Sequence, residues 1–457
     1  MPISFNKFDC AIIGSGISGI AAAQVCRELN VGHIMISPIT PAQPQTLDLS
    51  SNEKKLDTRN LTPKLSIKSF KQGLSAWRKR YPIRSTNFHL IQVLENHGLY
   101  KYWGCNLGHA GAYENRDELN KLLPVMKASD AQRLSKCDGK GITQIGKELK
   151  SSHLGFHIVG HDPLMAIDKQ QATTRCPRSK SFGCNCDGTN TTLINYDSMI
   201  IDGYVISLAK NDSGEFEIKI SSADDVQSTL KCSRIIFAAG PIASTNLASQ
   251  LVEVPQFVPV IHNGLYSFPF FSLIASPETP FGLSNLNLSI INAKSNELES
   301  YANIFPLRNQ LRAKFPWIQW LIPDLVLKRL YYCIVFTDSK FTDSVFDRSD
   351  NIITGRYKRP FKKHVWSTFT GIGKAMLFRL KAMPIMFPNI LKPGSDIHYA
   401  GCFSSSVIPK NLRQQIFFAD SSEVTSQPAM NPTALNLISM KRKLKKWLEP
   451  HNSLHEQ

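Results

Sequence analysis

Two stretches of the chain place a short apolar run directly before a glycine-containing turn and a helical pattern. The first run is Phe8 to Ile13, and apolar residues recur at helical spacing from Ala21 onward. The second run is Ile235 to Ala238, which Gly240-Pro241 ends before another helix. Such strand-turn-helix units are typical of α/β proteins with a parallel sheet. The sequence therefore predicts that the two runs lie in one sheet.

The rest of the pattern predicts further strands and a distinct middle region. His33 to Ile36 is predicted as the second strand, and residues 204–221 alternate around Asn211-Asp212-Ser213-Gly214 as a hairpin does. Residues 254–395 contain short apolar strands and proline-interrupted apolar stretches, which favours a substrate or cap domain. Near the end, Ile416 to Ala419 is predicted as a strand, and Pro432 to Leu444 as a helix with proline near its first position.

Composition and charge narrow the class of protein. The 457 residues suggest two or three domains, and 42% hydrophobic with 19% charged residues excludes collagen-like, coiled-coil and disordered chains. The net charge is +17, and the stretch from Arg308 to Lys381 holds 15 basic and 5 acidic residues. A local positive face of this kind can attract anionic lipid headgroups, phosphorylated substrates or RNA. A nucleic-acid binder would be more uniformly basic, so we expect no nucleic-acid partner.

The ten cysteines are spread along a chain that starts without a secretory hydrophobic region. Reduced thiols and a cytoplasmic location are therefore expected. Cys176, Cys184 and Cys186 lie close together, but their spacing lacks the paired arrangement of structural zinc sites. We expect a tight loop there and no metal.

Peripheral membrane binding is a further hypothesis. The run from Val254 to Pro277 is broken by prolines, and Phe315 to Phe336 contains charges, so neither predicts a transmembrane helix. The part from Phe315 to Tyr332 precedes Arg356 to Lys381, which holds eight basic and no acidic residues. A solvated basic face over a buried cap-domain core is the alternative. The apolar side chains concerned are Trp317, Trp320, Leu321, Leu325 and Leu327.

The turn after the first strand carries the clearest chemical motif. It reads Gly14-Ser15-Gly16-Ile17-Ser18-Gly19, a G-x-G-x-x-G pattern between a strand and a helix. The first glycine permits the turn, the second lets a pyrophosphate approach, and the third allows close packing of helix on strand. The motif predicts dinucleotide binding. Ser37 stands where an acidic residue normally binds the adenosine ribose, and it retains one possible hydrogen bond.

An aromatic and glycine-rich cluster occurs at residues 97–104, HGLYKYWG. Gly98 and Trp103 suit a backbone segment that lies against a flat ring system. An ordinary turn with a buried tryptophan is the alternative. Residues 181–196 are rich in turn-forming residues and lead into strands.

Three segments together resemble the glucose-methanol-choline family of FAD-dependent oxidoreductases, especially its shorter bacterial-type members. They are IIGSGISG near the N-terminus, IIFAAGPIAST in the middle, and HYAG followed by FFADSSEVTSQPAMNPTALNLISM near the end. These matches cover about a quarter of the chain, and residues 254–395 match nothing specific.

The resemblance implies a fold and a division into domains. The fold is α/β, with a Rossmann-like FAD-binding domain of parallel sheet plus β-meander and an α+β substrate or cap domain. The FAD-binding domain covers residues 1–253, with an irregular loop at 39–66 and a flavin-facing insert at 90–200. The substrate or cap domain covers residues 254–395. Residues 396–457 return to the FAD-binding domain and carry active-site residues.

The resemblance also implies roles for individual residues. Gly14, Gly16 and Gly19, with Ser18 in the same turn, would hold the FAD pyrophosphate. Other implied cofactor contacts are Ala239 and Gly240 over the nucleotide, Asp420 at the flavin end, Asn431 and Pro432 near the isoalloxazine ring, and the segment with Gly98 and Trp103 facing the flavin.

In such enzymes a CH–OH group is oxidised by hydride transfer to flavin N5. His398 resembles the family's active-site base, because a neutral imidazole can accept the hydroxyl proton. Asn431 corresponds to its partner. Seven other histidines, including His89, His161 and His262, lack comparable context.

The expected substrate is a small alcohol or sugar, or a lipid-linked glycan intermediate; no oligomeric state follows. Departures from the family pattern are Ser37, Cys402 in place of Thr or Ser, and the short His398–Asn431 interval of 33 residues. They leave open an alternative, a catalytically impaired flavin-binding protein that acts as a membrane-surface partner in a biosynthetic complex.

Overall fold

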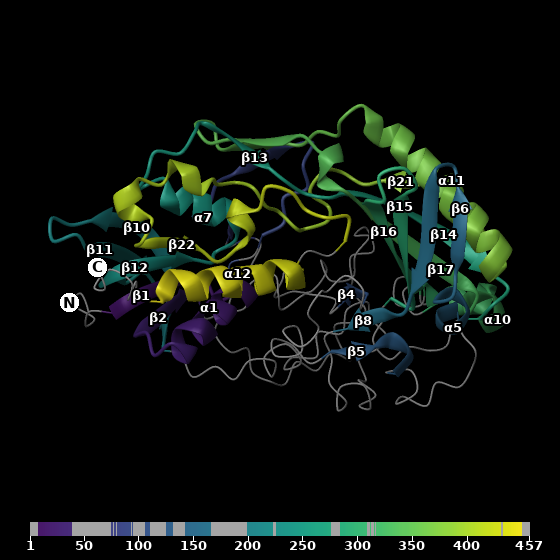
Figure 1. Cartoon of the computed structure of the whole chain (residues 1–457), viewed down its shortest axis with the longest axis horizontal. Helices are drawn as coiled ribbons and strands as arrows, with labels where there is room; N and C mark the ends of the chain where they lie inside the picture. Colours follow the sequence, from purple (N-terminus) through teal and green to yellow (C-terminus); the bar gives the residue numbers. More distant parts are fainter. Residues whose placement is uncertain are drawn as a thin grey trace, which may run out of the picture.

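The computed structural model describes most of the chain outside residues 39–74, 110–124, 131–141 and 166–198. The described residues are 8–38, 75, 77–78, 80–92, 94, 106–109, 125–130, 142–165, 199–222, 225–275, 284–308, 311, 315, 317–430 and 433–449. They form an elongated molecule with a parallel sheet at one end and a large antiparallel sheet at the other (Figure 1). The loop predicted at 39–66 and the turn-rich residues 181–196 lie outside the described residues.

A seven-stranded sheet forms the first end of the molecule. Its parallel strands are β1 (Phe8–Ile13), β2 (His33–Ser37), β9 (Ile200–Asp202), β12 (Gln227–Phe237) and β22 (Ile416–Phe418), in the order β22-β12-β1-β2-β9. The first half of β12 pairs instead with an antiparallel hairpin, β10 (Tyr204–Lys210) and β11 (Phe216–Ser221). This parallel sheet with its β-meander confirms the predicted architecture.

Helices cover both faces of this sheet because its central strand is apolar on both sides. In β1, Cys10 and Ile12 face one core, while Ala11 and Ile13 face the other. The first core is covered by α1 (Ile17–Glu28) and α12 (Thr433–Leu448). The second is covered by α7 (Pro241–Ala248). The sheet is therefore buried on both faces, as parallel sheets generally are.

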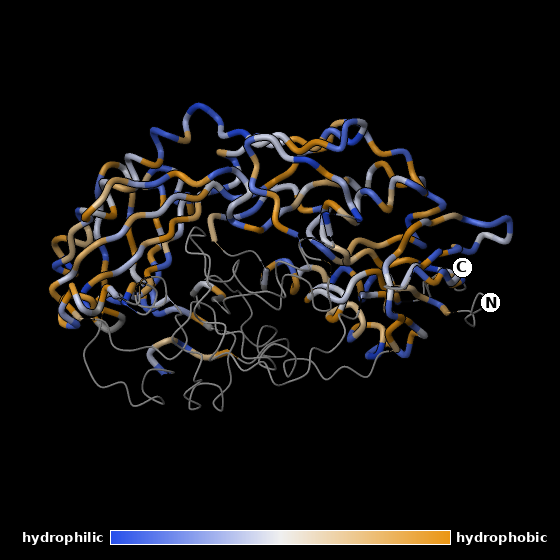
Figure 2. Tube along the Cα trace, turned by 180° about the vertical axis from the view of Figure 1, so that it is seen from behind, coloured by the Kyte–Doolittle hydropathy of each residue, from blue (hydrophilic) through white to orange (hydrophobic). Residues whose placement is uncertain are grey.

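The eight-stranded sheet forms the other end. Its strands are, in spatial order, β20 (Ala382–Pro384), β14 (Gly264–Ser272), β17 (Leu330–Thr337), β16 (Leu298–Pro306), β15 (Leu286–Asn292), β7 (Phe156–His161) and β6 (Lys150–His153), with β21 (Asn389–Ile390) also paired to β14. The long helix α11 (Pro360–Leu380) covers the face turned away from the parallel sheet (Figure 1). Figure 2, in which this end lies on the left, shows hydrophobic stretches along its strands.

One part of the predicted domain division needs correction. Residues 90–200 were expected as an insert of the FAD-binding domain, yet β6 and β7 lie in the eight-stranded sheet. The reason is that β7 pairs along its whole length with β15, from Phe156↔Asn292 to His161↔Asn287. Phe156 and Ile158 then join the core beneath α11.

Two small sheets connect the ends. A four-stranded sheet consists of β13 (Phe257–Val260), β18 (Ser344–Asp347), β19 (Ile352–Thr354) and β3 (Arg84–Thr86). A three-stranded sheet consists of β4 (Asn106–His109), β8 (Pro163–Met165) and β5 (Met126–Lys127). The expectation of short strands between Val254 and Pro277 is confirmed by β13 and β14.

Candidate active site

The carboxyl ends of β1, β2, β12 and β22 meet at one edge of the parallel sheet. Backbone hydrogen bonds hold these ends in register: Gly14 donates to Ile36 O at 2.9 Å, and Ala238 donates to Ile13 O at 2.8 Å. Ala419 donates to Phe237 O at 2.8 Å. Ligands of open α/β sheets bind at such an edge. The edge collects the predicted cofactor residues that follow these four strands.

The three motif glycines differ sharply in the space around them. A Cβ atom on Gly14 would lie 2.4 Å from Ala238 O, and its φ is +108°. A Cβ atom on Gly19 would lie 1.9 Å from Gly14 O, so α1 packs directly on the turn. A Cβ atom on Gly16 would meet no described atom within 4 Å. The middle glycine therefore leaves open space at the start of α1, where backbone N–H groups have no helical partner.

The remaining side chains of this turn lie at its base and at its rim. Ser18 is partly exposed in the first turn of α1. Ser37 is 1% exposed, and its hydroxyl shares a hydrogen bond with the Ser15 hydroxyl inside the turn. Ser37 thus braces the glycine turn against β2, and its predicted contact with the adenosine ribose stays a prediction.

Asp420 joins the end of β22 to the turn before α7. Its carboxylate accepts hydrogen bonds from the Gly240 N–H at 3.0 Å and from the Ser244 hydroxyl. It also accepts from the Ser422 N–H at 3.0 Å. Burial raises the pKa of Asp420, while the Ser244 and Ser422 hydrogen bonds oppose that shift. The carboxylate therefore clamps Gly240, whose φ is +90°, in its left-handed conformation.

Two hydrogen bonds hold the segment of His398 beside the segment of Asp420. Gly401 donates to Ser421 O at 3.1 Å, and the Ser421 hydroxyl donates to Tyr399 O at 2.6 Å. The His398 ring also lies against Phe336 of β17, with 6.3 Å between ring centroids. His398 therefore lies where the nucleotide edge meets the eight-stranded sheet.

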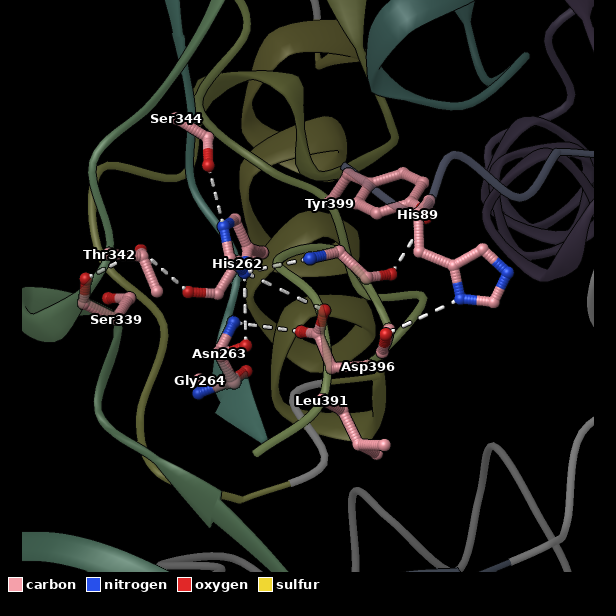
Figure 3. Close-up of polar contacts among 12 residues, drawn as sticks. His89, His262, Asn263, Gly264, Ser339, Thr342, Ser344, Leu391, Asp396 and Tyr399 are labelled. Atoms are coloured by element: carbon pink, nitrogen blue, oxygen red, sulfur yellow. Dashed lines mark hydrogen bonds and ion pairs between the residues drawn. The ribbon is translucent and has the colours of Figure 1, made fainter. Parts of the chain in front are cut away.

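A buried polar network holds the backbone on the N-terminal side of His398 (Figure 3). Asp396 is 4% exposed and accepts a hydrogen bond from the Asn263 N–H at 2.8 Å. The fully buried His262 lies with its Nδ1 3.9 Å from the Asp396 carboxyl. Its Nε2 shares a hydrogen bond of 2.9 Å with Ser344. This network ties the segment of His398 to β14 and to β18.

Burial shifts the pKa values of the two titratable groups of this network, Asp396 and His262, in opposite directions. It raises the pKa of Asp396 to about 8, against the backbone N–H groups of Asn263, Ile397 and His398. It lowers the pKa of His262 to about 4, against a hydrogen bond with the Asn263 carbonyl. Desolvation thus favours the neutral form of each group near pH 7. The pair acts through hydrogen bonds rather than through an ion pair.

The residues on either side of His398 are constrained as well. The Tyr399 hydroxyl donates to His89 O at 2.7 Å and accepts from the Ile91 N–H at 2.8 Å. Ile397 has φ +66°, a conformation that a β-branched residue adopts only under strain. Strained backbone of this kind clusters at functional sites. The local sequence gave no signal for Asp396 or Ile397 as site residues.

The eight-stranded sheet carries buried amide side chains on the face whose Phe336 contacts His398. Val335 faces the core beneath α11, so its neighbour Phe336 faces the opposite side, where it contacts His398. On that same side, Asn303 lies between Ile334 and Asn287 on the adjacent strands. Asn303 is 6% exposed and Asn287 is fully buried. The sequence analysis missed these amides, although alternation in LNLSIIN and YANIFP was a readable signal.

Several predicted residues lie outside the described part of the chain. They are Gly98, Trp103, Asn431, Pro432, Cys176, Cys184 and Cys186. Their roles stay predictions. The described residues contain no group of His, Cys, Asp or Glu side chains that could hold a metal ion. Cys402 is fully buried and directs its thiol toward Ala400 O at 3.5 Å.

Solved structures share this arrangement over the whole chain. Pyridoxine 4-oxidase from Mesorbium loti aligns with a TM-score of 0.57 and 11% identity, covering 96% of this chain and 99% of its own. A formate oxidase from Aspergillus oryzae RIB40, studied for its FAD modification, aligns with a TM-score of 0.57 and 9% identity, covering 98% of each chain. The chain has the fold of these oxidases. No protein-family model and no curated protein sequence matches it.

This likeness confirms the fold that the glucose-methanol-choline resemblance implies. At such low sequence identity, this likeness shows the fold alone. The chemistry of the site therefore has to be argued from the described residues.

Proposed function

We propose that this protein is an FAD-dependent oxidoreductase that oxidises a CH–OH group of a small molecule. The observation that carries the proposal is the contrast among the motif glycines: Gly14 and Gly19 are packed against backbone, and Gly16 is open. Packing alone requires the first and third glycines, whereas an open second glycine is required only if a ligand approaches the backbone. The shape of the turn fits a pyrophosphate group.

The described residues at the sheet edge fit the nucleotide part of FAD. The N–H groups at the start of α1 would hold the pyrophosphate, and the turn at Ala239-Gly240 would lie over the nucleotide. Asp420 fixes that turn through the Gly240 N–H. When bound, FAD supplies the acceptor for the two electrons of alcohol oxidation.

His398 would accept the proton of the substrate hydroxyl. A neutral imidazole is suited to this step near neutral pH. The backbone of His398 is held by Asp396 on one side and by the Tyr399 hydroxyl bonds on the other. The Asn303 amide lies on the same face of the sheet, and its buried Oδ1 has no hydrogen-bond partner among the described residues, so it can accept a hydrogen bond from a further hydroxyl group. Asn287 instead donates to Gly108 O at 3.0 Å and accepts from the Ser284 hydroxyl at 2.6 Å. The Asn303 amide supports a substrate with more than one hydroxyl group, such as a sugar or a lipid-linked glycan intermediate.

The first test is cofactor content. Purified protein should show the absorption of oxidised flavin, and Gly16→Val should fold normally without it, because the side chain enters the space that the pyrophosphate needs. Gly373→Val is the matched control, since Gly373 lies in α11 without a positive φ and a Cβ atom there would meet nothing closer than Pro384 Cγ at 3.5 Å. Wild-type protein that lacks flavin and gains no thermal stability from added FAD would contradict the proposal.

The second test separates an enzyme from a flavin-binding partner without turnover. Under anaerobic conditions, a panel of alcohols and sugars is added to flavin-loaded protein, and the flavin absorption is followed. If the protein is an enzyme, a substrate in the panel reduces the bound flavin and its absorption is lost. The alternative function predicts bound flavin that no member of the panel reduces.

A further inference from the structure

The exposed apolar side chains of this protein gather at one end. Among the described residues, thirteen of the eighteen exposed large hydrophobic side chains lie at Leu273, in 317–326 or in 366–387. Several are largely open to solvent, including Trp320 at 83%, Phe387 at 77% and Phe378 at 73%. Apolar patches of this extent mark interaction surfaces in soluble proteins.

Helix α11 contributes one part of this surface. Its inner face, with Val365, Ile372 and Met376, is fully buried against the eight-stranded sheet. Its outer face nevertheless carries exposed apolar side chains among exposed lysines, where a solvated helix is normally polar. The apolar ones on this face and in the following segment are Trp366, Leu377, Phe378, Met383, Ile385, Met386 and Phe387.

The short helices α9 (Ile318–Leu321) and α10 (Asp324–Leu327) contribute the other part. Trp317, Trp320, Leu321 and Leu325 are each more than half exposed, which contradicts the alternative that this stretch is a buried core. The sequence analysis grouped Leu327 with them, and this prediction was wrong because Leu327 is fully buried. It is buried because α10 ends there, just before β17 enters the sheet.

Hydrogen bonds from the Leu273 backbone and from the Arg329 side chain join the two parts. Leu273, 61% exposed, donates its N–H to the carbonyl of Lys381 at the end of α11. The Arg329 guanidinium donates to Leu273 O at 3.2 Å and to Leu325 O at 3.3 Å. The two helical regions therefore border one continuous surface, which we call the apolar end.

The apolar end carries a net positive charge. Residues 356–395 contain nine basic and no acidic residues. Asp324 is the acidic residue of α10, and it is paired with Arg308 at 2.7 Å and with Lys328 at 3.2 Å. A water-soluble protein partner of mixed charge gives no reason for such an excess. Anionic phospholipid headgroups do, because Lys and Arg can meet the phosphates while aromatic and Leu side chains enter the boundary below them.

We propose that the apolar end binds the surface of an anionic membrane. Attachment is peripheral, because no helix among the described residues is long and apolar enough to cross a bilayer. The strand β17 then links the membrane-bound end to the active site. It begins at Leu330, beside the apolar end, and reaches the His398 contact at Phe336, about 20 Å away at ~3.3 Å per residue.

The experiment is co-sedimentation of the full chain with vesicles. Vesicles of phosphatidylcholine with phosphatidylglycerol should sediment the protein at low salt, and high salt should release much of it, since the attraction is screened over about 10 Å at 0.1 M salt. Vesicles of phosphatidylcholine alone should bind more weakly. Failure to sediment with anionic vesicles at low salt would overturn the proposal.

Two sets of variants assign the binding to this surface. Trp320→Ser with Phe378→Ser should lower the binding constant by at least about tenfold, and Lys374→Gln with Arg379→Gln should do the same with a smaller salt effect. Phe257→Ser is the apolar control, 60% exposed on β13, and Lys219→Gln with Lys410→Gln is the charge control. Equal losses in test and control variants would contradict the proposal.

Association of two copies through the apolar end is the competing outcome. Sedimentation velocity without lipid measures it directly. A dimer that Trp320→Ser with Phe378→Ser converts to monomer would overturn membrane binding in favour of self-association. Because none of these measurements depends on flavin, they stay separate from the test of the proposed function.

Discussion

The nucleotide edge and the eight-stranded sheet are built by different means. At the nucleotide edge, backbone atoms approach each other closely and glycines make the approach possible, as the 1.9 Å separation at Gly19 shows. In the eight-stranded sheet, side chains alternate between two faces, so one strand serves both the core beneath α11 and the region of His398. At the nucleotide edge, the space between backbone atoms limits which residues are tolerated. In the eight-stranded sheet, the face on which a side chain lies decides whether it serves the core or the active site. Substitutions should therefore fail in different ways in the two regions.

The largest effect is expected at Gly19. In Gly19→Val the new side chain would collide with Gly14 O, so α1 would have to separate from β1. Overpacking of this severity costs more than ~3 kcal/mol, and we expect little soluble protein. Gly16→Val provides the contrast, because its side chain enters open space and leaves the apoprotein folded. Circular dichroism and thermal unfolding of both variants measure the difference. Equal stability of the two variants would contradict the packing argument.

His398→Ala tests the chemistry where the two regions meet. Loss of a positioned base slows reaction by about 10²- to 10⁴-fold, so the variant should be folded and yellow with slow flavin reduction. His89→Ala is the matched control, since that imidazole contacts Ser395 at the surface. Stopped-flow reduction measures both variants. A wild-type rate in His398→Ala would remove this histidine from the mechanism.

Adjacent residues of β17 separate the two faces of one strand. Val335 is fully buried against the α11 core, so Val335→Ala should lower the free energy of unfolding by about 1 to 3 kcal/mol without slowing flavin reduction. Phe336→Ala should slow reduction, because it removes the ring that His398 lies against. Denaturant unfolding and reduction kinetics of both variants give the comparison. The same pattern of losses in both would mean that the faces are not separate in function.

The Asp396–His262 pair predicts a dependence of stability on pH. The Asp396 carboxyl, with a pKa of about 8 when folded, keeps a proton that the unfolded chain has lost above about pH 4. Its contribution to stability therefore falls as pH rises from about 4 to 8. His262, with a folded pKa of about 4, acts in the opposite sense between about pH 4 and 6.5.

The two slopes cancel up to about pH 6.5, and a loss of about 2 kcal/mol remains between pH 6.5 and 8. Asp396→Asn should remove this loss, as measured by denaturant unfolding at both pH values. Asp212→Asn, an exposed carboxyl in the β10–β11 turn, should keep the wild-type difference. If Asp396→Asn also lost stability between pH 6.5 and 8, the Asp396 carboxyl would not be the source of the pH dependence.

Features that depend on neighbours in the sequence were predictable. The strand, turn and helix around Gly14 to Gly19 are encoded by spacing, and so is the β10–β11 hairpin. His398 was reached through resemblance; the structure holds its segment beside the segment of Asp420, and its catalytic role stays a prediction.

Features that depend on distant pairing were not predictable. Asp396 and Asn263 bond across 133 positions of sequence, and their segments are brought together by the bridge between Ile261 and Ala400 and by the pairing of β21 with β14. The alternation in β16 was visible, but which face meets a helix and which meets His398 follows from the register with β17. Likewise, β7 was assigned to the wrong region because its partner β15 lies far along the chain.

Strand β22 also determines when the parallel sheet can finish folding during synthesis. The outer side of β12 at Ile235–Phe237 pairs with Ile416–Phe418, about 180 residues further along. At about 5 to 20 residues per second, a ribosome needs roughly 10 to 40 s between these strands. During that interval the end of β12 is an open edge that can pair with another chain. The glycine turn is made about 400 residues before Asp420, yet its binding edge is complete only once Asp420 has emerged.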